Sequence, residues 1–372
     1  MSLSKGLPEA RRNEAASLFR ARGVPTRRVE AWKYSDLRAA LGDAGFGSGA
    51  AEWKIGSLPA GVELFDLAEP NAPDWVRTYL GTLTRNVASA ASLLQSAGGV
   101  ALRVTGAASA PLSLEFSGAG HVRALIILET GASLTLLESQ TGGTEALRNT
   151  GVEIVLGANA ELRHVRLAPV AAGAVRLEEI GMRLARDARY HGHYASFGAR
   201  LSRLELDIAL EGEGAEAHLS GVSVLGDEAH ADITTHLRHT VGRTHSTQLF
   251  KNVAGGKSRA IYQGKVSVAK DANGSDSRQT AKALLLGPRA EADLKPELEI
   301  LADDVKCAHG AAVGDLDADS LFYLRARGIP EDEARALLIH AFLEDAVSQI
   351  AAEDMRVPVL AAVEAALAGI LA

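Results

Sequence analysis

Four short segments carry the pattern that decides the fold: Gly131-Ala132-Ser133-Leu134, Asn159-Ala160-Glu161-Leu162, Asp187-Ala188-Arg189-Tyr190 and Gly214-Ala215-Glu216-Ala217. In each segment a turn-forming residue precedes an alanine, and the four alanines lie 28, 28 and 27 residues apart. Each unit contains two strand-like runs, such as ELRHVRL (161–167) and RLEEIGMRL (176–184). A turn residue and a small residue that recur at a fixed period are typical of a parallel β-solenoid, in which each coil stacks on the previous one.

A β-sandwich is the alternative, because evenly sized hairpins also place strands at regular spacing. Sandwich loops rarely keep one register over four units, so the period favours the solenoid. We therefore expect a mainly β protein, a right-handed parallel β-helix (residues 98–312) between an N-terminal helical region (1–97) and a C-terminal helical region (313–372).

The flanking regions have helical patterns of their own. In the N-terminal region we predict helices over residues 7–22, 27–42 and 74–95, with mixed loop and short elements over 43–71. In the C-terminal region, Pro330 begins a helix whose apolar residues form one stripe. The stripe comprises Ala334, Leu337, Leu338, Ala341, Phe342 and Ile350. It could pack on the solenoid or bind a partner, and the pattern alone does not separate these.

Composition narrows the functional class. A net charge of −7 argues against non-specific binding to nucleic acid, which requires basic patches. The single cysteine excludes an internal disulfide framework and suits a reducing compartment. The N-terminus lacks the apolar core of a signal peptide, and no apolar run is long enough to span a membrane. We expect a soluble, cytoplasmic protein that binds neither nucleic acid nor membrane.

The single cysteine, Cys307, lies two residues before His309 in a segment that is preceded by an apolar alternation, Leu298 and Ile300. If one strand runs through this segment, both side chains lie on the same face. A thiolate and an imidazole are plausible ligands for a soft metal, but zinc and iron–sulfur sites usually need four ligands. The pair is therefore at most half of a metal site. An inert, buried cysteine beside a surface histidine is the simpler interpretation.

Two further patterns remain without a predicted function. Seven of the eleven histidines lie between His191 and His245. Stacked coils could align them into a row that binds metal, but such histidines more often face solvent or hydrogen-bond to neighbouring coils. Gly255-Gly256-Lys257-Ser258 mimics the end of a phosphate-binding loop, but the first glycine of that motif is replaced by Lys251. The residues that follow it have a strand pattern, so we do not predict a nucleotide site.

Four segments in the C-terminal part of the chain follow one another in a fixed order: QTAKALLLG (279–287), KPELEI (295–300), DDVKCAHGA (303–311) and LFYLRARGI (321–329). With RRVEAWKYSDLR (27–38) near the N-terminus, they resemble the SufB/SufD family, which supplies the scaffold of the Suf iron–sulfur cluster assembly system. Within the family the chain is similar to SufD rather than SufB, because it carries Cys-x-His-Gly at 307–310 and lacks the glutamate and the upstream cysteine of SufB-like members.

The resemblance implies a non-catalytic scaffold subunit with a β-helix fold. Such a subunit would pair with a SufB-like protein through its β-helix and with a SufC-like ATPase through Leu337, Leu338, Ala341 and Phe342. A transient iron–sulfur cluster would form at the SufB–SufD interface with His309 and Cys307 as ligands, and the isolated chain, a possible homodimer, would hold no stable cofactor.

Two functions of other classes compete with this one. A polysaccharide-cleaving β-helix enzyme would need paired carboxylates on one coil face and usually secretion, and the acidic residues here are scattered over turns. A stand-alone metal-binding or storage solenoid would use the histidine-rich coils and would bind metal tightly without a partner.

Overall fold

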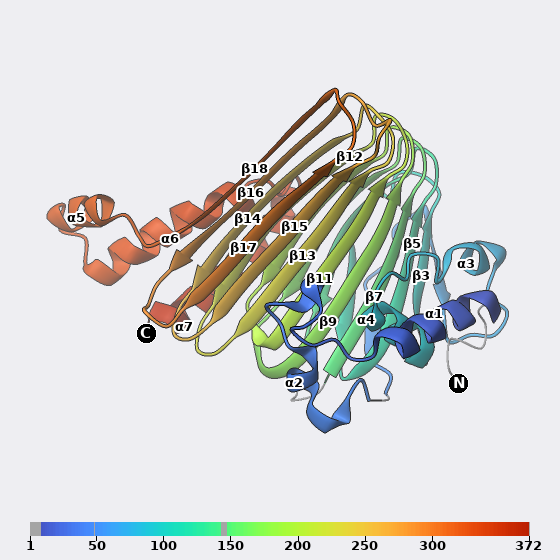
Figure 1. The fold of residues 1–372 in the computed structure, drawn as a ribbon, viewed down its shortest axis with the longest axis horizontal. Helices are drawn as coiled ribbons and strands as arrows, with labels where there is room; N and C mark the ends of the chain where they lie inside the picture. The colour runs from blue at the N-terminus through green and yellow to red at the C-terminus, as the bar shows by residue number, and fades with distance from the viewer. Residues whose placement is uncertain (1–8, 48, 143–146, 372) are drawn as a thin grey trace.

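The computed structural model describes residues 9–47, 49–142 and 147–371. Its centre is a parallel β-solenoid, as the repeat predicts, in which strands alternate between two nine-stranded sheets (Figure 1). Sheet A contains β2 (Val62–Asp66), β3 (Gly99–Val104), β5 (Gly120–Leu128), β7 (Leu147–Leu156), β9 (Ala171–Leu184), β11 (Ala199–Leu210), β13 (His230–His239), β15 (Arg259–Val268) and β17 (Glu291–Ile300). Sheet B contains β1 (Glu52–Ile55), β4 (Leu112–Ser117), β6 (Ser133–Gln140), β8 (Glu161–Ala168), β10 (Arg189–Ser196), β12 (Glu216–Leu225), β14 (His245–Ala254), β16 (Ser275–Leu285) and β18 (Val305–Gly314).

The repeated segments form one corner of each coil. Their first residues, Gly131, Asn159, Asp187 and Gly214, all have positive φ angles, between 57° and 72°. Glycine, asparagine and aspartate enter this left-handed region most easily, which explains the restricted residue type. The alanines that follow are fully buried in the corner, and the next residues, Ser133, Glu161, Arg189 and Glu216, lie side by side in register. The predicted repeat is thus the coil of the solenoid.

Side chains that point inward from both sheets form a continuous apolar core. In β6 buried and half-exposed residues alternate, as expected where the outer face meets solvent. In β7 eight of the ten residues are buried, because its outer face is covered by an N-terminal helix. The N-terminal helices therefore cover sheet A, and two C-terminal helices, α6 (Glu331–Val347) and α7 (Arg356–Leu371), cover sheet B (Figure 1).

The two ends of the solenoid differ. At the first coil, the short strands β1 and β2 pair antiparallel with β4 and β3 and close both sheet edges. At the last coil, in the part of the chain that the structure describes, β17 and β18 each pair on one side only. The solenoid therefore ends in two uncapped edge strands of ten residues each.

The N-terminal region contains α1 (Glu9–Arg22), α2 (Leu37–Leu41), α3 (Asp74–Tyr79), α4 (Val87–Gln95) and short 3-10 turns at Glu30–Trp32 and Gly42–Ala44. With β1 and β2 in the same region, it is not wholly helical, and the predicted helix over 27–42 is largely wrong. Residues 30–36 instead lie on sheet A. There the Trp32 ring packs on the Arg203 guanidinium, with Arg203 Cζ 4.0 Å from the ring centroid, and the Ser35 hydroxyl donates to Asp232 Oδ2 at 2.6 Å.

The predicted helix over 74–95 is interrupted between α3 and α4. The backbone N–H groups of Gly81 and Leu83 donate to the Glu153 carboxylate on β7, at 2.7 and 2.9 Å, instead of continuing a helix. Asn86 then caps α4 by accepting from the Ser89 N–H.

The C-terminal region contains α5 (Ala318–Ala326), α6 (Glu331–Val347), a 3-10 turn (Glu353–Met355) and α7 (Arg356–Leu371). Helix α7 and the second half of α6 pack on sheet B, whereas α5 and the start of α6 extend away from the solenoid (Figure 1). None of the described helices is long and apolar enough to cross a membrane.

Candidate functional site

Cys307 and His309 lie on β18, in the last coil. The strand that contains Leu298 and Ile300 does not continue to them, because β17 ends at Ile300 and β18 begins at Val305 in the other sheet. Within β18 the two side chains nevertheless share the inner face, as their spacing predicts. Cys307 is half-buried and packs against the apolar core, and this burial raises the pKa of its thiol. His309 is exposed, since no further coil covers it.

A column of hydroxyl groups runs through the solenoid behind Cys307. Ser277, the register partner of Cys307 on β16, bonds to Ser246 with 2.8 Å between their hydroxyl oxygens. Ser246 lies 2.9 Å from His239 Nε2, and Thr244 lies 2.7 Å from His239 Nδ1. Burial lowers the pKa of His239 to about 4, so its ring is neutral at pH 7. The inner face beside Cys307 is therefore polar, although most of the core is apolar.

The column continues past His239 to the corner of the next coil. The Thr244 hydroxyl oxygen lies 3.2 Å from the Val241 carbonyl oxygen and 3.2 Å from the Ser275 hydroxyl. Sequence alone could not bring Ser246, Ser277 and Cys307 together, because they are 31 and 30 positions apart and meet only through the register of the coils.

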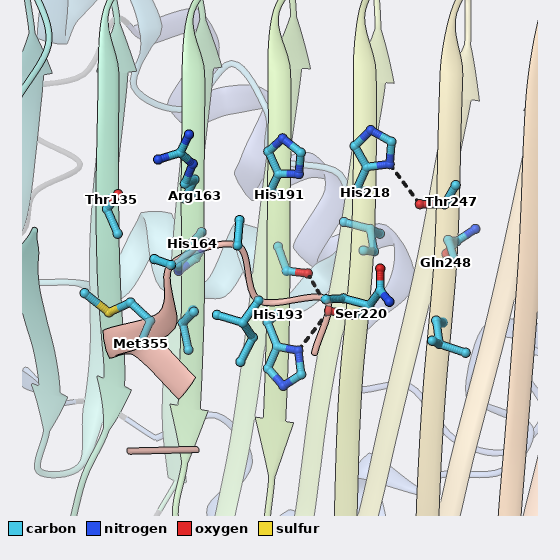
Figure 2. A pocket seen from close by; sticks show the side chains of 18 of the residues that line it. Thr135, Arg163, His164, His191, His193, His218, Ser220, Thr247, Gln248 and Met355 are labelled. Carbon is cyan, nitrogen blue, oxygen red and sulfur yellow. Dashed lines mark hydrogen bonds between the residues drawn. The ribbon is translucent and has the colours of Figure 1, made fainter. Parts of the chain in front are cut away.

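The histidine-rich coils form a separate feature on the outer face of sheet B. A cavity of about 450 Å³ lies between this face and residues 349–355. Arg163, His191, His218 and Thr247 are among the side chains that line it (Figure 2). The His191 and His218 rings stack with centroids 5.0 Å apart. His218 Nδ1 lies 2.9 Å from the Thr247 hydroxyl, and His218 Nε2 lies 3.2 Å from a Glu216 carboxylate oxygen.

The row thus connects neighbouring coils by stacking and by the hydrogen bond to Thr247. Below the row, His193 bonds through Nδ1 to Ser220 at 2.8 Å, and burial lowers the pKa of His193 to about 3. Over the whole described chain, no group of three or more His, Cys, Asp or Glu side chains is arranged to hold a metal ion.

The four residues predicted to bind a partner lie on α6 but point in different directions. Leu337 is 46% exposed and Ala341 is also exposed, whereas Leu338 is half-buried. Phe342 packs against the solenoid, with Lys251 Nζ 4.6 Å from its ring centroid. The outer face of α6 therefore contains Leu337 and Ala341, and Phe342 belongs partly to the packing of the helix on sheet B.

The opposite face of α6 is buried on sheet B. Its buried residues in the second half of the helix are Ile339, Leu343, Ala346 and Val347. Helix α5 adds two large exposed side chains that were not among the predicted partner-binding residues, Phe322 (73% exposed) and Tyr323 (56% exposed). Such apolar exposure on a projecting helix is typical of an interaction surface.

The same region carries the similarity to known proteins. Residues 114–342, more than half of the chain, match the family described as "SUF system FeS cluster assembly, SufBD core domain". The chain belongs to the SufB/SufD family. The matched segment of this SufD-like chain contains Cys307, His309 and the helix α6 residues up to Phe342, and it ends before α7.

Curated relatives agree with this assignment. The chain is 34% identical to the iron–sulfur cluster assembly protein SufD of Escherichia coli over 251 residues, which cover 67% of this chain and 59% of that protein. It is 31% identical to protein ABCI7, chloroplastic, of Arabidopsis thaliana, over 63% of this chain and 50% of that protein. A SufBD family protein of Mycobacterium leprae is 28% identical over 92% of this chain and 90% of its own length. The chain thus spans between half and three-fifths of the first two relatives.

Proposed function

We propose that this SufD-like chain is a non-catalytic scaffold subunit for iron–sulfur cluster assembly, and that it acts through the last coil of its solenoid together with a SufB-like subunit. The observation that carries the proposal is that the only thiol of the chain and an exposed imidazole lie on the same face of an uncapped edge strand. An edge strand offers free backbone groups to a second chain, which can bring further ligands to the same place.

The surroundings of this edge support the proposal. Leu301, between β17 and β18, is 63% exposed, and Val313 on β18 is also exposed, so the last coil presents apolar side chains that a partner would cover. Cys307 and His309 provide sulfur and nitrogen ligands of the kind that hold iron in clusters. The cluster is the cargo of the pair, and ligands from the partner complete its coordination. Without a SufB-like partner, a second copy of the chain can cover the same edge as a homodimer.

A second contact serves an ATPase of the SufC type. Helix α5 and the outer face of α6 project from the solenoid and expose Phe322, Tyr323, Leu337 and Ala341. Leu338 and Phe342, which were predicted with Leu337 and Ala341, lie at the margin of this surface. Binding there leaves the last coil free for the SufB-like subunit, so one scaffold can hold both partners.

The test compares the chain alone with the chain co-purified with a SufB-like partner, after anaerobic supply of ferrous iron and sulfide. We expect iron and acid-labile sulfide to be retained by the pair and not by the isolated chain. Stable iron binding by the isolated chain at the level of the pair would contradict the proposal and favour the alternative, a stand-alone metal-binding or storage solenoid.

A further inference from the structure

A second polar column crosses the interior and ends beside His309. Thr235 on β13 and Tyr262 on β15 both donate to the amide oxygen of Gln248 on β14, at 2.7 and 3.1 Å. Gln279 on β16 donates through Nε2 to the Tyr262 hydroxyl at 2.9 Å. Gln279 is also the register partner of His309 on β18. The column therefore connects the middle of the solenoid with the neighbour of one expected cluster ligand.

The Gln279 amide points its nitrogen at Tyr262. Burial raises the pKa of Tyr262, which keeps its phenolic proton and gives it to Gln248. The Tyr262 oxygen accepts from the amide nitrogen of Gln279, which faces it at 2.9 Å. The amide oxygen of Gln279 is left without any donor, although the side chain is 1% exposed. A buried acceptor without a partner costs free energy unless a donor arrives.

The neighbouring strand keeps space for this amide. Gly264 lies on β15, and a Cβ atom built at Gly264 would be 1.7 Å from Gln279 Nε2. No side chain larger than hydrogen fits at Gly264 while Gln279 holds its place. The position of the amide is thus set by the backbone of one strand and by the Tyr262 hydroxyl of the same strand.

His309 is the register neighbour of Gln279 and can supply the missing donor. It lies on the inner face of β18, one strand spacing of about 4.8 Å from Gln279, and within the described chain it makes no hydrogen bond. A histidine that binds a metal usually donates its other ring N–H to an outer acceptor, which fixes the ring orientation. The amide oxygen of Gln279, which has no donor of its own, can serve as that acceptor.

We propose that Gln279 is a positioning residue for His309: its buried amide oxygen accepts one ring N–H of His309 and leaves the other ring nitrogen free to bind iron at the partner interface. The contact forms when the exposed imidazole turns toward β16 as the partner covers the last coil. This inference rests on the proposed function, because it assumes that His309 is a ligand.

The experiment uses the complex with a SufB-like partner and measures its affinity for ferrous iron in the presence of sulfide. Gln279→Leu removes the acceptor and should weaken iron binding at least about tenfold, the usual effect of losing an outer-shell partner. Gln279→Glu keeps an acceptor oxygen and should restore most of the affinity. The matched control is Gln263→Leu, a buried glutamine on the outer face of β15 that faces the N-terminal segment and should leave iron binding unchanged.

A crystal structure of the complex gives a readout that does not depend on the cluster. We expect the Gln279 oxygen and the nearer His309 ring nitrogen to be within about 3.2 Å. If Gln279→Leu does not fold, Tyr262→Phe removes only the hydroxyl that holds the amide and should weaken iron binding by a smaller factor. Wild-type affinity in the Gln279 or Tyr262 variant, or equal loss in Gln279→Leu and Gln279→Glu, overturns the inference. Unchanged affinity in His309→Ala would instead refute the proposed function itself.

Discussion

Substitutions on the two faces of helix α6 can distinguish a loss of ATPase binding from a loss of packing within the chain. Leu337 lies on the outer face and is 46% exposed, whereas Leu343 lies on the opposite face and is 1% exposed. Leu337→Asp therefore places a carboxylate in solvent in the free chain and in an apolar contact in the complex. Leu343→Asp places the same group against sheet B in both states.

The two changes differ in their expected free energies. Burying a leucine side chain is worth about 1.5–3 kcal/mol, and a carboxylate without a partner in the contact costs a further few kcal/mol. Leu337→Asp should thus weaken ATPase binding by about 4 kcal/mol, or about a thousandfold in Kd. Its effect on the free energy of unfolding should be within about 0.5 kcal/mol, as for most surface substitutions.

The assay is calorimetric titration of a SufC-like ATPase into each variant, with thermal unfolding measured in parallel. Leu343→Asp is the control and should lower the unfolding temperature strongly, because it buries a charge in the packing between α6 and sheet B. Phe342→Asp is a less specific probe, because Phe342 also packs under Lys251. Wild-type affinity in Leu337→Asp, or a loss of stability similar to that of Leu343→Asp, would refute the assignment of the outer face.

Other predictions concern the solenoid and its titratable groups. Arg123→Met should lower the free energy of unfolding by about 3–5 kcal/mol in urea titrations, because it leaves the buried carboxylate of Glu153 without its cation. Burial raises the pKa of Glu179 to about 8 from 4.5, so the stability that this group contributes should be lost as the pH rises from about 5 to 8. Glu179→Gln should remove that loss of a few kcal/mol, and equal slopes of wild type and variant between pH 6.5 and 8 would contradict the assignment. Burial lowers the pKa of His193 to about 3 from 6.5, so its contribution should be lost as the pH drops below 6.5, and His193→Gln should remove that loss. Alkylation of the half-buried Cys307 should be slow in the free chain and slower still with a SufB-like partner, and unchanged labelling would place the interface elsewhere.

The fold could be predicted because its corners need particular residue types. Gly131, Asn159 and Asp187 supply positive φ angles at a constant spacing, which the sequence displays directly. The pattern weakens after Gly214 although the register of the strands continues. Thr244, 29 residues after Ala215, and Ser275, 31 residues after Thr244, take the place of the corner alanines. Both are buried and bond to each other, so a small polar residue fills the corner as well as alanine does.

The N-terminal region was less predictable, because tertiary contacts override local preference there. Residues 80–86 would continue a helix on pattern alone, but Glu153 on sheet A takes up two of their N–H groups. The apolar stripe of α6 indicated a packed helix without indicating which side faces sheet B. Leu343 is buried and Leu337 is exposed because the side of α6 that packs on sheet B is set by tertiary contacts with the solenoid.

At the candidate site, the spacing of two residues was enough to place Cys307 and His309 on one face. The columns behind them were not predictable, since Ser277, Gln279 and Tyr262 meet only when the register of the coils is known. The only feature of the sequence that these residues share is weak. They are polar residues at strand positions that point into the core, where apolar residues are expected.

The most direct test of the central claim is the iron and acid-labile sulfide content of the complex with a SufB-like partner, wild type against His309→Ala, at equal recovery of the complex. Because His309 is exposed and makes no hydrogen bond within the described chain, its removal should leave folding and pairing unchanged. The account predicts that the variant complex assembles normally and retains much less iron and sulfide than the wild type. Equal iron and sulfide in the two complexes would show that the cluster forms elsewhere and would contradict the role assigned to the last coil.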